Sequence, residues 1–124
     1  MLYLHTMEQF YSILSRATSD DGTHVYTLSI NPEHAIFQGH FPGRPIVPGV
    51  MTLYLVRQCA EQAAQLGATR LASVKEAKYL SPIIPDGRPV TISFTIDADL
   101  NIKATVTDPD GVEYTRVKAQ IVKI

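Results

Sequence analysis

Residues 49–66 form the feature that most limits how this chain can fold, because their spacing is helical and apolar side chains cover nearly the whole circumference. The apolar residues are Val50, Met51, Leu53, Leu55, Val56, Cys59, Ala60, Ala63, Ala64 and Leu66. A helix that is apolar nearly all round needs other structure on several of its sides. Pro48 suits the first helical position, and Gly67 suits a left-handed cap after the last turn. The sequence therefore predicts one central, well-covered helix.

The segments on both sides of this helix alternate between apolar and polar residues, as strands with one buried face do. The predicted strands are residues 10–18, 24–30, 71–80, 90–96, a segment around 102–106, and 112–124. Residues 81–89 are rich in turn formers, and Asp108-Pro109-Asp110-Gly111 is a strong hairpin signal. Residues 31–48 contain four prolines and are predicted to be a loop. An antiparallel sheet of about six strands curled round one helix, an α+β fold, satisfies this inventory.

Length and charge indicate one globular domain, residues 1–124, without a strong attraction to polyanions. Hydrophobic residues make up 45% of the chain and charged residues 19%, which is ordinary for a folded domain. Lys and Arg number 11 against 12 Asp and Glu, giving a net charge of -1. Because nucleic acid and membrane surfaces both favour a clear basic excess, neither is expected as the main partner.

The single cysteine and the N-terminal residues favour a cytoplasmic protein. Cys59 has no cysteine with which to pair, and its apolar surroundings in the helix predict a buried structural thiol rather than a nucleophile. Residues 1–15 lack the basic start and continuous apolar core of a secretory signal. No run reaches the ~18 apolar residues of a membrane-spanning helix.

The loop that leads into the helix carries the most specific motif, Gly-His-Phe-Pro-Gly-Arg-Pro-Ile-Val-Pro-Gly-Val at residues 39–50. It places His40 in a loop braced by prolines, and rigid placement is what a catalytic base requires. The Gly49 N–H lies at the positive end of the helix dipole, where it can polarise a thioester carbonyl. The plain alternatives are a stiffened loop and an ordinary helix start. His5, His24 and His34 are interpreted as structural or solvated, and the histidines form no metal-ligand cluster with suitable partners.

This motif resembles the active-site segment of the hot-dog-fold 3-hydroxyacyl-[acyl-carrier-protein] dehydratases of the FabA/FabZ type. Their pattern is Gly-His-Phe-Pro-Gly, a variable residue, Pro, two aliphatic residues, Pro-Gly and a helix. Gln58 fits the family's helix glutamine, and residues 74–86 resemble its long central strand and the Pro-rich turn after it. The first dozen residues show no such match. The resemblance implies a hot-dog fold and the removal of water from a (3R)-3-hydroxyacyl thioester to give the trans-2-enoyl product, with no metal or other cofactor.

The resemblance also implies a role for each residue of the site. His40 is the expected base at the carbon beside the thioester carbonyl, and the Gly49 N–H is expected to stabilise the charge that develops on the carbonyl oxygen. The family's second catalytic group is a helix Glu or Asp, and the aligned residue here is Tyr54, a far weaker acid that can still donate a hydrogen bond. The expected substrate contacts are Phe41, Gly43, Val50, Leu53, Arg57, Gln58 and Tyr79.

The tyrosine leaves several functions open. In one, the chain is a working dehydratase in which Tyr54, or a water that it holds, assists the leaving hydroxyl. In another, it is one half of a heterodimer, because the family's sites combine the histidine and the acid from opposite subunits and a paralogue can supply the acid. The chain can also be a non-catalytic acyl-binding module or, with Glu61 as carboxylate, a thioesterase.

The partner that the resemblance implies is an acidic acyl carrier protein, which holds the acyl chain through phosphopantetheine. A homodimer or a heterodimer with a paralogue is expected as well. The candidate docking charges, expected near the mouth of the acyl tunnel, are Arg44, Arg70, Lys75, Lys78 and Arg88. Ordinary solvated surface charge is the alternative for each of them.

Overall fold

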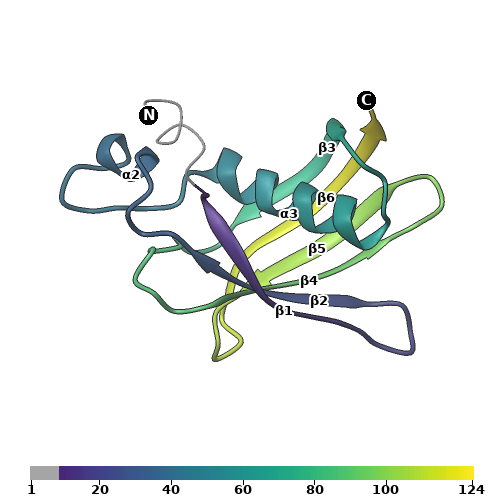
Figure 1. Cartoon of the computed structure of the whole chain (residues 1–124), viewed down its shortest axis with the longest axis horizontal. Helices are drawn as coiled ribbons and strands as arrows, with labels where there is room; N and C mark the ends of the chain where they lie inside the picture. Colours follow the sequence, from purple (N-terminus) through teal and green to yellow (C-terminus); the bar gives the residue numbers. More distant parts are fainter. Residues whose placement is uncertain (1–8) are drawn as a thin grey trace.

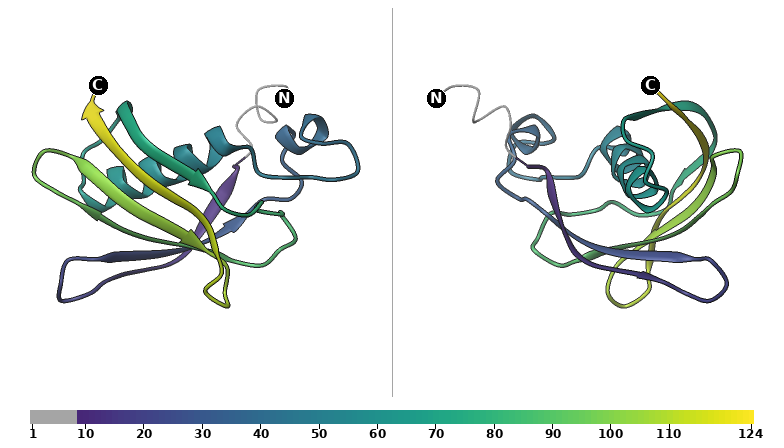
Figure 2. Two further views of the ribbon diagram at one scale, coloured as in Figure 1. Left: turned by 180° about the vertical axis from the view of Figure 1, so that it is seen from behind. Right: turned by 45° about the vertical axis from the view of Figure 1, so that its right-hand side comes forward.

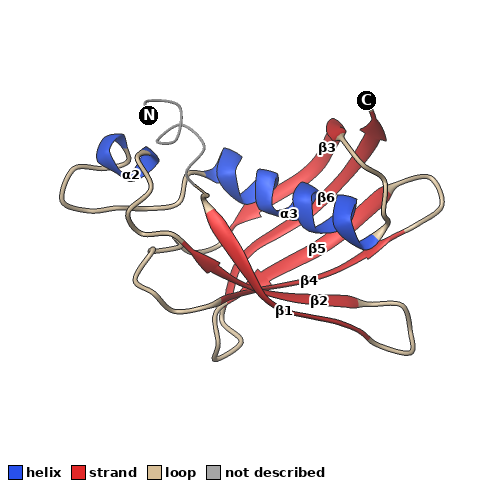
Figure 3. Ribbon diagram, viewed as in Figure 1, coloured by secondary structure: helices blue, strands red, loops and turns tan. Residues whose placement is uncertain are grey.

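Residues 9–124, which this computed structural model describes, form one curved antiparallel sheet with a long helix against its inner face (Figures 1 and 3). The strands are β1 (Tyr11–Thr18), β2 (His24–Ile30), β3 (Thr69–Tyr79), β4 (Val90–Ile96), β5 (Asn101–Thr107) and β6 (Glu113–Lys123). The helices are α2 (Ile36–Gly39) and α3 (Gly49–Ala63). Part of the N-terminal prediction, including His5, concerns residues 1–8 and lies outside the described residues.

The strand order, β1-β2-β4-β5-β6-β3, explains how the helix comes to lie across the sheet. Strand β2 lies near one edge and β3 forms the other, so the connection between them must cross from one side of the sheet to the other. Helix α3 is part of that connection, and the two views of Figure 2 show it lying in the concave side of the curled sheet. The predicted order of two strands, one long helix and four strands is confirmed, with the short helix α2 as an addition before α3.

The core lies between α3 and the sheet. Leu28, Ile92 and Val106 come from three neighbouring strands and are completely buried, and Leu55 meets them from the helix side. Burying a side chain of this size stabilises the fold by about 1.5–3 kcal/mol. The alternation of apolar residues in the strands therefore determines which face of the sheet packs against α3. The buried residues of α3 determine which side of the helix faces the sheet.

Residues 9–124 leave one face of α3 open. Val50 is 69% exposed, and Leu53 and Tyr54 are half-buried, whereas Thr52 and Val56 are fully covered. Within residues 9–124, the sheet therefore covers one side of α3, and the expected cover on its other sides is not provided. The physical reason is that a single curled sheet reaches only one side of a helix.

Both ends of α3 differ from the prediction. Pro48 is the residue before the helix, with ψ 146°, rather than its first helical residue. The helix ends at Ala63 instead of Leu66, because Gln65 and Gly67 both adopt positive φ angles, 54° and 73°, and turn the chain towards β3. Strand β3 begins at Thr69, two residues earlier than predicted.

The predicted loop at residues 31–48 contains the short helix α2. Phe37 is buried there and packs on Phe10, with ring centroids 5.9 Å apart. His34 accepts a hydrogen bond from the Ile36 N–H at 3.1 Å and lies edge-on to Phe10 at 5.3 Å, which agrees with a structural role. The sequence analysis missed this helix because prolines on both sides of it indicate a loop. Burial of Phe37 stabilises it.

Within residues 9–124, no helix is long and apolar enough to cross a membrane.

Candidate functional site

Backbone hydrogen bonds close the loop that carries His40. The N–H of Phe41 donates to the Arg44 carbonyl at 3.1 Å, and the N–H of Arg44 donates back to the Phe41 carbonyl at 2.9 Å. The N–H of Ile46 donates to the His40 carbonyl at 2.9 Å, and Gly43 takes the left-handed conformation, φ 74°, that favours glycine. The His40 side chain is exposed, and its ring lies 5.6 Å from that of Phe41. The imidazole thus stands on the surface of the chain, on a backbone that is held in place.

The start of α3 packs closely against Tyr79. The Tyr79 hydroxyl donates to the Gly49 carbonyl at 3.1 Å, and a Cβ added at Gly49 would lie 2.7 Å from the Tyr79 Cζ. Burial raises the pKa of Tyr79, so its hydroxyl stays protonated and keeps donating. With the ring in this position, only glycine fits at residue 49, and its N–H has no partner within the helix.

Gly49 and Tyr79 line a hollow of about 440 Å³. Ile46, Val47 and Ile83 supply apolar wall, and Thr52 and Thr115 supply hydroxyl groups. A largely apolar hollow with a few polar groups is the usual form of a small-molecule site. Neither His40 nor Tyr54 is among the described residues that line it. A second, smaller hollow of about 260 Å³ lies beside α2, and Phe41 and Gly43 line it together with His34.

Tyr54 belongs to an aromatic cluster on α3. The Tyr11 ring lies edge-on to it at 6.2 Å, and the Arg57 guanidinium lies 5.5 Å from the centre of the Tyr54 ring. The Tyr11 hydroxyl donates to the Gln58 Oε1 at 3.3 Å. Burial raises the pKa of Tyr11 to about 12, so this phenol is neutral at physiological pH. These contacts orient the Tyr54 ring and engage the amide oxygen of Gln58.

Arg57 and Glu61 tie α3 to the start of β3. The Arg57 Nη1 donates to the Thr69 carbonyl at 3.0 Å and approaches the Glu61 Oε1 at 3.4 Å. The Thr69 hydroxyl donates to the same carboxylate oxygen at 2.7 Å. The Glu61 carboxylate is therefore already engaged in a structural contact, which weighs against a thioesterase that uses it.

The predicted substrate contacts thus fall into separate groups. Phe41 and Gly43 accompany His40, Tyr79 accompanies Gly49, and Val50 and Leu53 lie on the open face of α3 beside Tyr54. Arg57 and Gln58 are held by neighbouring side chains. The contacts of the described residues do not join His40 to Tyr54, since each ring pairs with other partners.

The predicted docking charges include an ion-paired arginine and two residues that lie far apart on one strand. Arg88 pairs with Asp110 at 3.0 Å and Asp108 at 3.9 Å. Arg70 and Lys78 lie at opposite ends of β3, and eight residues of strand span about 26 Å. Strand direction thus keeps Arg70 apart from Lys78, and the docking of a carrier protein by these five residues stays a prediction.

The sequence analysis did not single out two residues that make contacts with α3, Tyr11 and Thr69. Tyr11 comes from the N-terminal stretch that shows no family match, and its only signal is its place in the strand alternation. Thr69 is 4% exposed and carries the contact between α3 and β3, yet the sequence marks it only as a residue near a turn. Cys59 is 1% exposed, and burial raises its pKa to about 12, which confirms the buried structural thiol.

Comparison with known proteins gives the family. Residues 16–115 match the model of the ApeI-like family, described as ApeI dehydratase. The chain belongs to this family. This ApeI-like chain is 28% identical over 121 residues to the 3-hydroxyacyl-[acyl-carrier-protein] dehydratase FabZ of Brucella abortus, a match that covers 87% of this chain and 76% of that protein. It is 36% identical over 69 residues to FabZ of Novosphingobium aromaticivorans, which covers 49% of this chain but only 42% of that relative.

A solved structure confirms the fold of the ApeI-like chain. The dehydratase heterocomplex ApeI:P from Xenorhabdus doucetiae matches with a TM-score of 0.76 at 19% identity, over 90% of this chain and 97% of that one. The predicted resemblance to hot-dog-fold dehydratases of the FabZ type is confirmed. In residues 9–124, no group of three or more His, Cys, Asp and Glu side chains is placed to hold a metal ion.

Proposed function

We propose that this chain is a dehydratase subunit that converts (3R)-3-hydroxyacyl thioesters of an acyl carrier protein into trans-2-enoyl thioesters, with His40 as the base. Membership of the ApeI-like family and the names of the FabZ relatives support this reaction class. The observation that carries the proposal is the closed loop that presents His40 and leads directly to Gly49 at the start of α3. We also propose that residues 1–124 fold as one domain.

The chemistry follows from the groups that the chain presents. The imidazole of His40 takes the proton from the carbon beside the thioester carbonyl, and near-neutral basicity suits it to that step. The electron pair moves towards the carbonyl oxygen, where the Gly49 N–H at the positive end of α3 stabilises the developing charge. The bond from carbon 3 to the hydroxyl oxygen then breaks as the double bond forms, and the hydroxyl leaves as water after it receives a proton.

The group that delivers that last proton decides how active the chain is by itself. Tyr54 can donate a hydrogen bond to the leaving hydroxyl, and its contacts with Tyr11 and Arg57 orient its ring. Replacing a positioned carboxylic acid commonly costs about 10²- to 10⁴-fold in rate. We therefore expect slow turnover when Tyr54 stands in for the acid.

A partner subunit can supply the missing carboxylate. The open apolar face of α3, where Val50 is 69% exposed, is a surface that residues 9–124 do not cover. The Xenorhabdus structure is a dehydratase heterocomplex. Both observations support a heterodimer in which His40 faces an acid from a paralogue. A homodimer that uses Tyr54 in both sites is the alternative.

The test is turnover of a 3-hydroxyacyl thioester, and hydration of the corresponding enoyl thioester, by wild-type and His40→Ala protein in the same subunit complex. We expect His40→Ala to lower turnover by about 10² or more. His24→Ala is the matched control, because His24 lies at the start of β2 and contacts Thr18 and Phe94 instead. Full activity in His40→Ala would exclude His40 as the base.

The same experiment separates the other candidate functions. A non-catalytic acyl-binding module binds acyl thioesters without turnover, and His40→Ala leaves that binding unchanged. A thioesterase releases free thiol, which a thiol reagent detects directly. The engagement of Glu61 by Arg57 and Thr69 leads us to expect no such release.

A further inference from the structure

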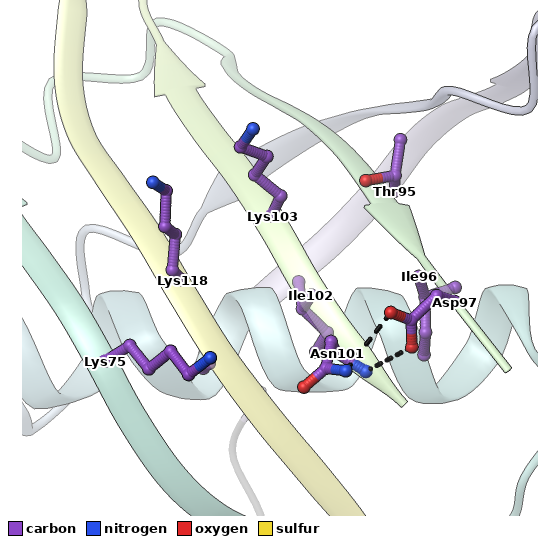
Figure 4. A pocket seen from close by; sticks show the side chains of 9 residues that line it. Lys75, Thr95, Ile96, Asp97, Asn101, Ile102, Lys103 and Lys118 are labelled. Atoms are coloured by element: carbon purple, nitrogen blue, oxygen red, sulfur yellow. Dashed lines mark hydrogen bonds between the residues drawn. The ribbon is translucent and has the colours of Figure 1, made fainter. Parts of the chain in front are cut away.

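The face of the sheet that points away from α3 carries a strip of exposed cations. Its members, called the outer strip below, are Lys75, Lys78, Lys103, Arg116 and Lys118. On β5 and β6 they alternate with residues that are buried against the helix, such as Ala104 and Val117. Figure 4 shows Lys103 and Lys118 side by side on neighbouring strands with the helix behind the sheet, and Lys75 extending from β3 towards them. Five of the chain's 11 Lys and Arg residues thus lie on one face.

The strand register sets these cations directly opposite one another. Lys103 pairs with Lys118 across β5 and β6, and Arg116 pairs with Lys78 across β6 and β3. Like charges in directly opposite positions destabilise a sheet. The irregularity between Val74 and Glu76 interrupts the alternation of β3 next to Lys75, and such bulges commonly re-aim a side chain.

Nearby carboxylates balance the outer strip only in part. Glu76 lies 3.5 Å from Lys78 and opposite Lys118, and Glu113 binds Arg116 at 2.6 Å. Asp97 lies at the end of the strip and is held by Asn101 at 3.1 Å. Three carboxylates against five cations leave a positive excess on this face, although the whole chain has a net charge of -1. An arrangement that costs stability and concentrates charge favours an acidic partner.

The surface around these cations suits an acidic protein better than a nucleic acid. Two hollows of about 320 and 460 Å³ share Lys103 and Lys118, and Thr95 lines both. Hydroxyl groups from Ser93 and Thr105 continue the lining. Phe94, the aromatic residue at these hollows, is 1% exposed and offers no stacking surface for a base.

One end of the outer strip adjoins the candidate substrate hollow. Lys78 and Arg116 lie opposite each other, and the next pair along the same two strands is Tyr79 and Thr115. Tyr79 and Thr115 both line the hollow that contains Gly49. The side chains of Tyr79 and Thr115 point to the α3 side of the sheet, whereas those of Lys78 and Arg116 point away from it. A carrier seated on the strip would therefore lie on the other face from the hollow, one residue away along the strands, and its flexible arm would pass round the end of β3 to reach Tyr79.

We propose that the outer strip is the docking surface for the acidic acyl carrier protein, so that its thioester arm enters beside Tyr79. This proposal rests on the proposed function, because the carrier protein is the partner only if carrier-bound thioesters are the substrates. It keeps Lys75 and Lys78 from the predicted docking residues, adds Lys103, Arg116 and Lys118, and leaves out Arg44, Arg70 and Arg88.

The test compares two double charge reversals in the intact protein complex. Lys103→Glu/Lys118→Glu removes the centre of the strip, and Arg16→Glu/Lys123→Glu makes the same change in net charge at exposed residues of β1 and β6 away from the strip. Binding of a fluorescently labelled, phosphopantetheinylated acyl carrier protein is measured at low salt and at about 0.3 M salt. Turnover is measured with the carrier-bound thioester and with a carrier-free pantetheine thioester.

We expect Lys103→Glu/Lys118→Glu to weaken carrier binding by about tenfold or more and to flatten its salt dependence. Turnover of the carrier-bound substrate should fall in parallel, while turnover of the pantetheine thioester stays at the wild-type level. Unchanged carrier affinity, or an equal loss in Arg16→Glu/Lys123→Glu, would overturn the proposal. Tighter binding of a single-stranded RNA oligonucleotide than of the carrier would overturn it as well. If neither substrate is turned over, the proposed function fails, and the binding data still decide the docking surface.

Two further variants separate docking from folding. Lys103→Glu alone places opposite charges across β5 and β6, so its melting temperature should equal or exceed that of the wild type while carrier binding weakens. Lys103→Gln/Lys118→Gln removes the charges without reversing them and should weaken binding to a smaller extent. Weaker binding that appears only together with a lower melting temperature would contradict the proposal.

Discussion

Under the proposed function, Tyr54 is the residue at which a single substitution would supply the expected helix carboxylate. The Tyr54→Glu variant places a carboxyl group at a half-buried position of α3. The Arg57 guanidinium, which lies over the Tyr54 ring, can offset the cost of burying that charge. If the chain lacks only an acid, we expect turnover of a 3-hydroxyacyl thioester by the homomeric protein to rise by about 10²-fold. Steady-state dehydration kinetics measure this directly.

Tyr54→Phe is the matched control, because it keeps the ring that packs against Tyr11 and Arg57 and removes only the hydroxyl. A fall in turnover in this variant would assign the hydrogen bond to Tyr54 itself. A folded Tyr54→Glu variant with wild-type turnover would show that the missing group does not come from this position.

At the residue scale, sequence reasoning succeeded where the signal is local. The motif at residues 39–50 indicated a histidine loop and a glycine at the helix start, and both follow from neighbouring residues. Tyr11 was missed because its partners, Tyr54 and Gln58, are more than 40 residues away in the sequence. Such contacts depend on how the strands assemble, which no short pattern contains.

The contact between α3 and β3 leads to a prediction at the scale of elements. Glu61→Gln weakens the charged hydrogen bonds from Thr69 and Arg57 and leaves the guanidinium half-buried without its carboxylate. We expect the free energy of unfolding to fall by about 1–2 kcal/mol, with no change in thioester hydrolysis. Chemical denaturation and a thiol-release assay measure the two effects.

Glu113→Gln is the control for this change, because it breaks the more exposed ion pair with Arg116. Surface pairs of this kind contribute little to stability because water screens them, so we expect a smaller loss. Equal losses in the two variants would mean that the α3–β3 contact is no stronger than a surface pair. If the wild type releases thiol and Glu61→Gln alone loses that release, the thioesterase hypothesis would be supported instead.

Element ends were predicted less well than element types. The alternation of residues 24–30 and 90–96 gave β2 and β4 with their observed bounds, because periodicity is a repeated signal. The end of α3 was placed three residues too late, since apolar residues continue to Leu66 while Gln65 already adopts a left-handed φ of 54°. Apolar spacing shows which residues can be buried and carries little information about where the backbone turns.

At the scale of the whole molecule, the open face of α3 is the feature with the clearest consequence for assembly. The sequence predicted a helix covered on several sides, and residues 9–124 cover only the side that carries residues such as Leu55 and Cys59. The strand order, with β3 and β1 at the edges, could not be read from local patterns because it arises from long-range pairing. The exposed apolar residues of α3 are those for which the predicted cover is missing in residues 9–124.

We therefore expect Val50→Lys to weaken the association of this chain with its partner subunit. A buried valine contributes about 1.5–3 kcal/mol, so its replacement by a charged side chain should raise the dissociation constant by about tenfold or more. Because Val50 is 69% exposed in the single chain, the stability of the isolated subunit should not fall. Native mass spectrometry across a dilution series gives the dissociation constant, and thermal unfolding gives the subunit stability.

Val112→Lys makes the same change at another exposed valine, 55% accessible, just before β6 and away from α3. This control should keep both the complex and its turnover. If the family's two-subunit site applies, Val50→Lys should lose turnover in proportion to the lost complex, and raising the partner concentration should recover it. A complex of unchanged affinity in Val50→Lys would place the subunit interface elsewhere, and the open face of α3 would then need another explanation.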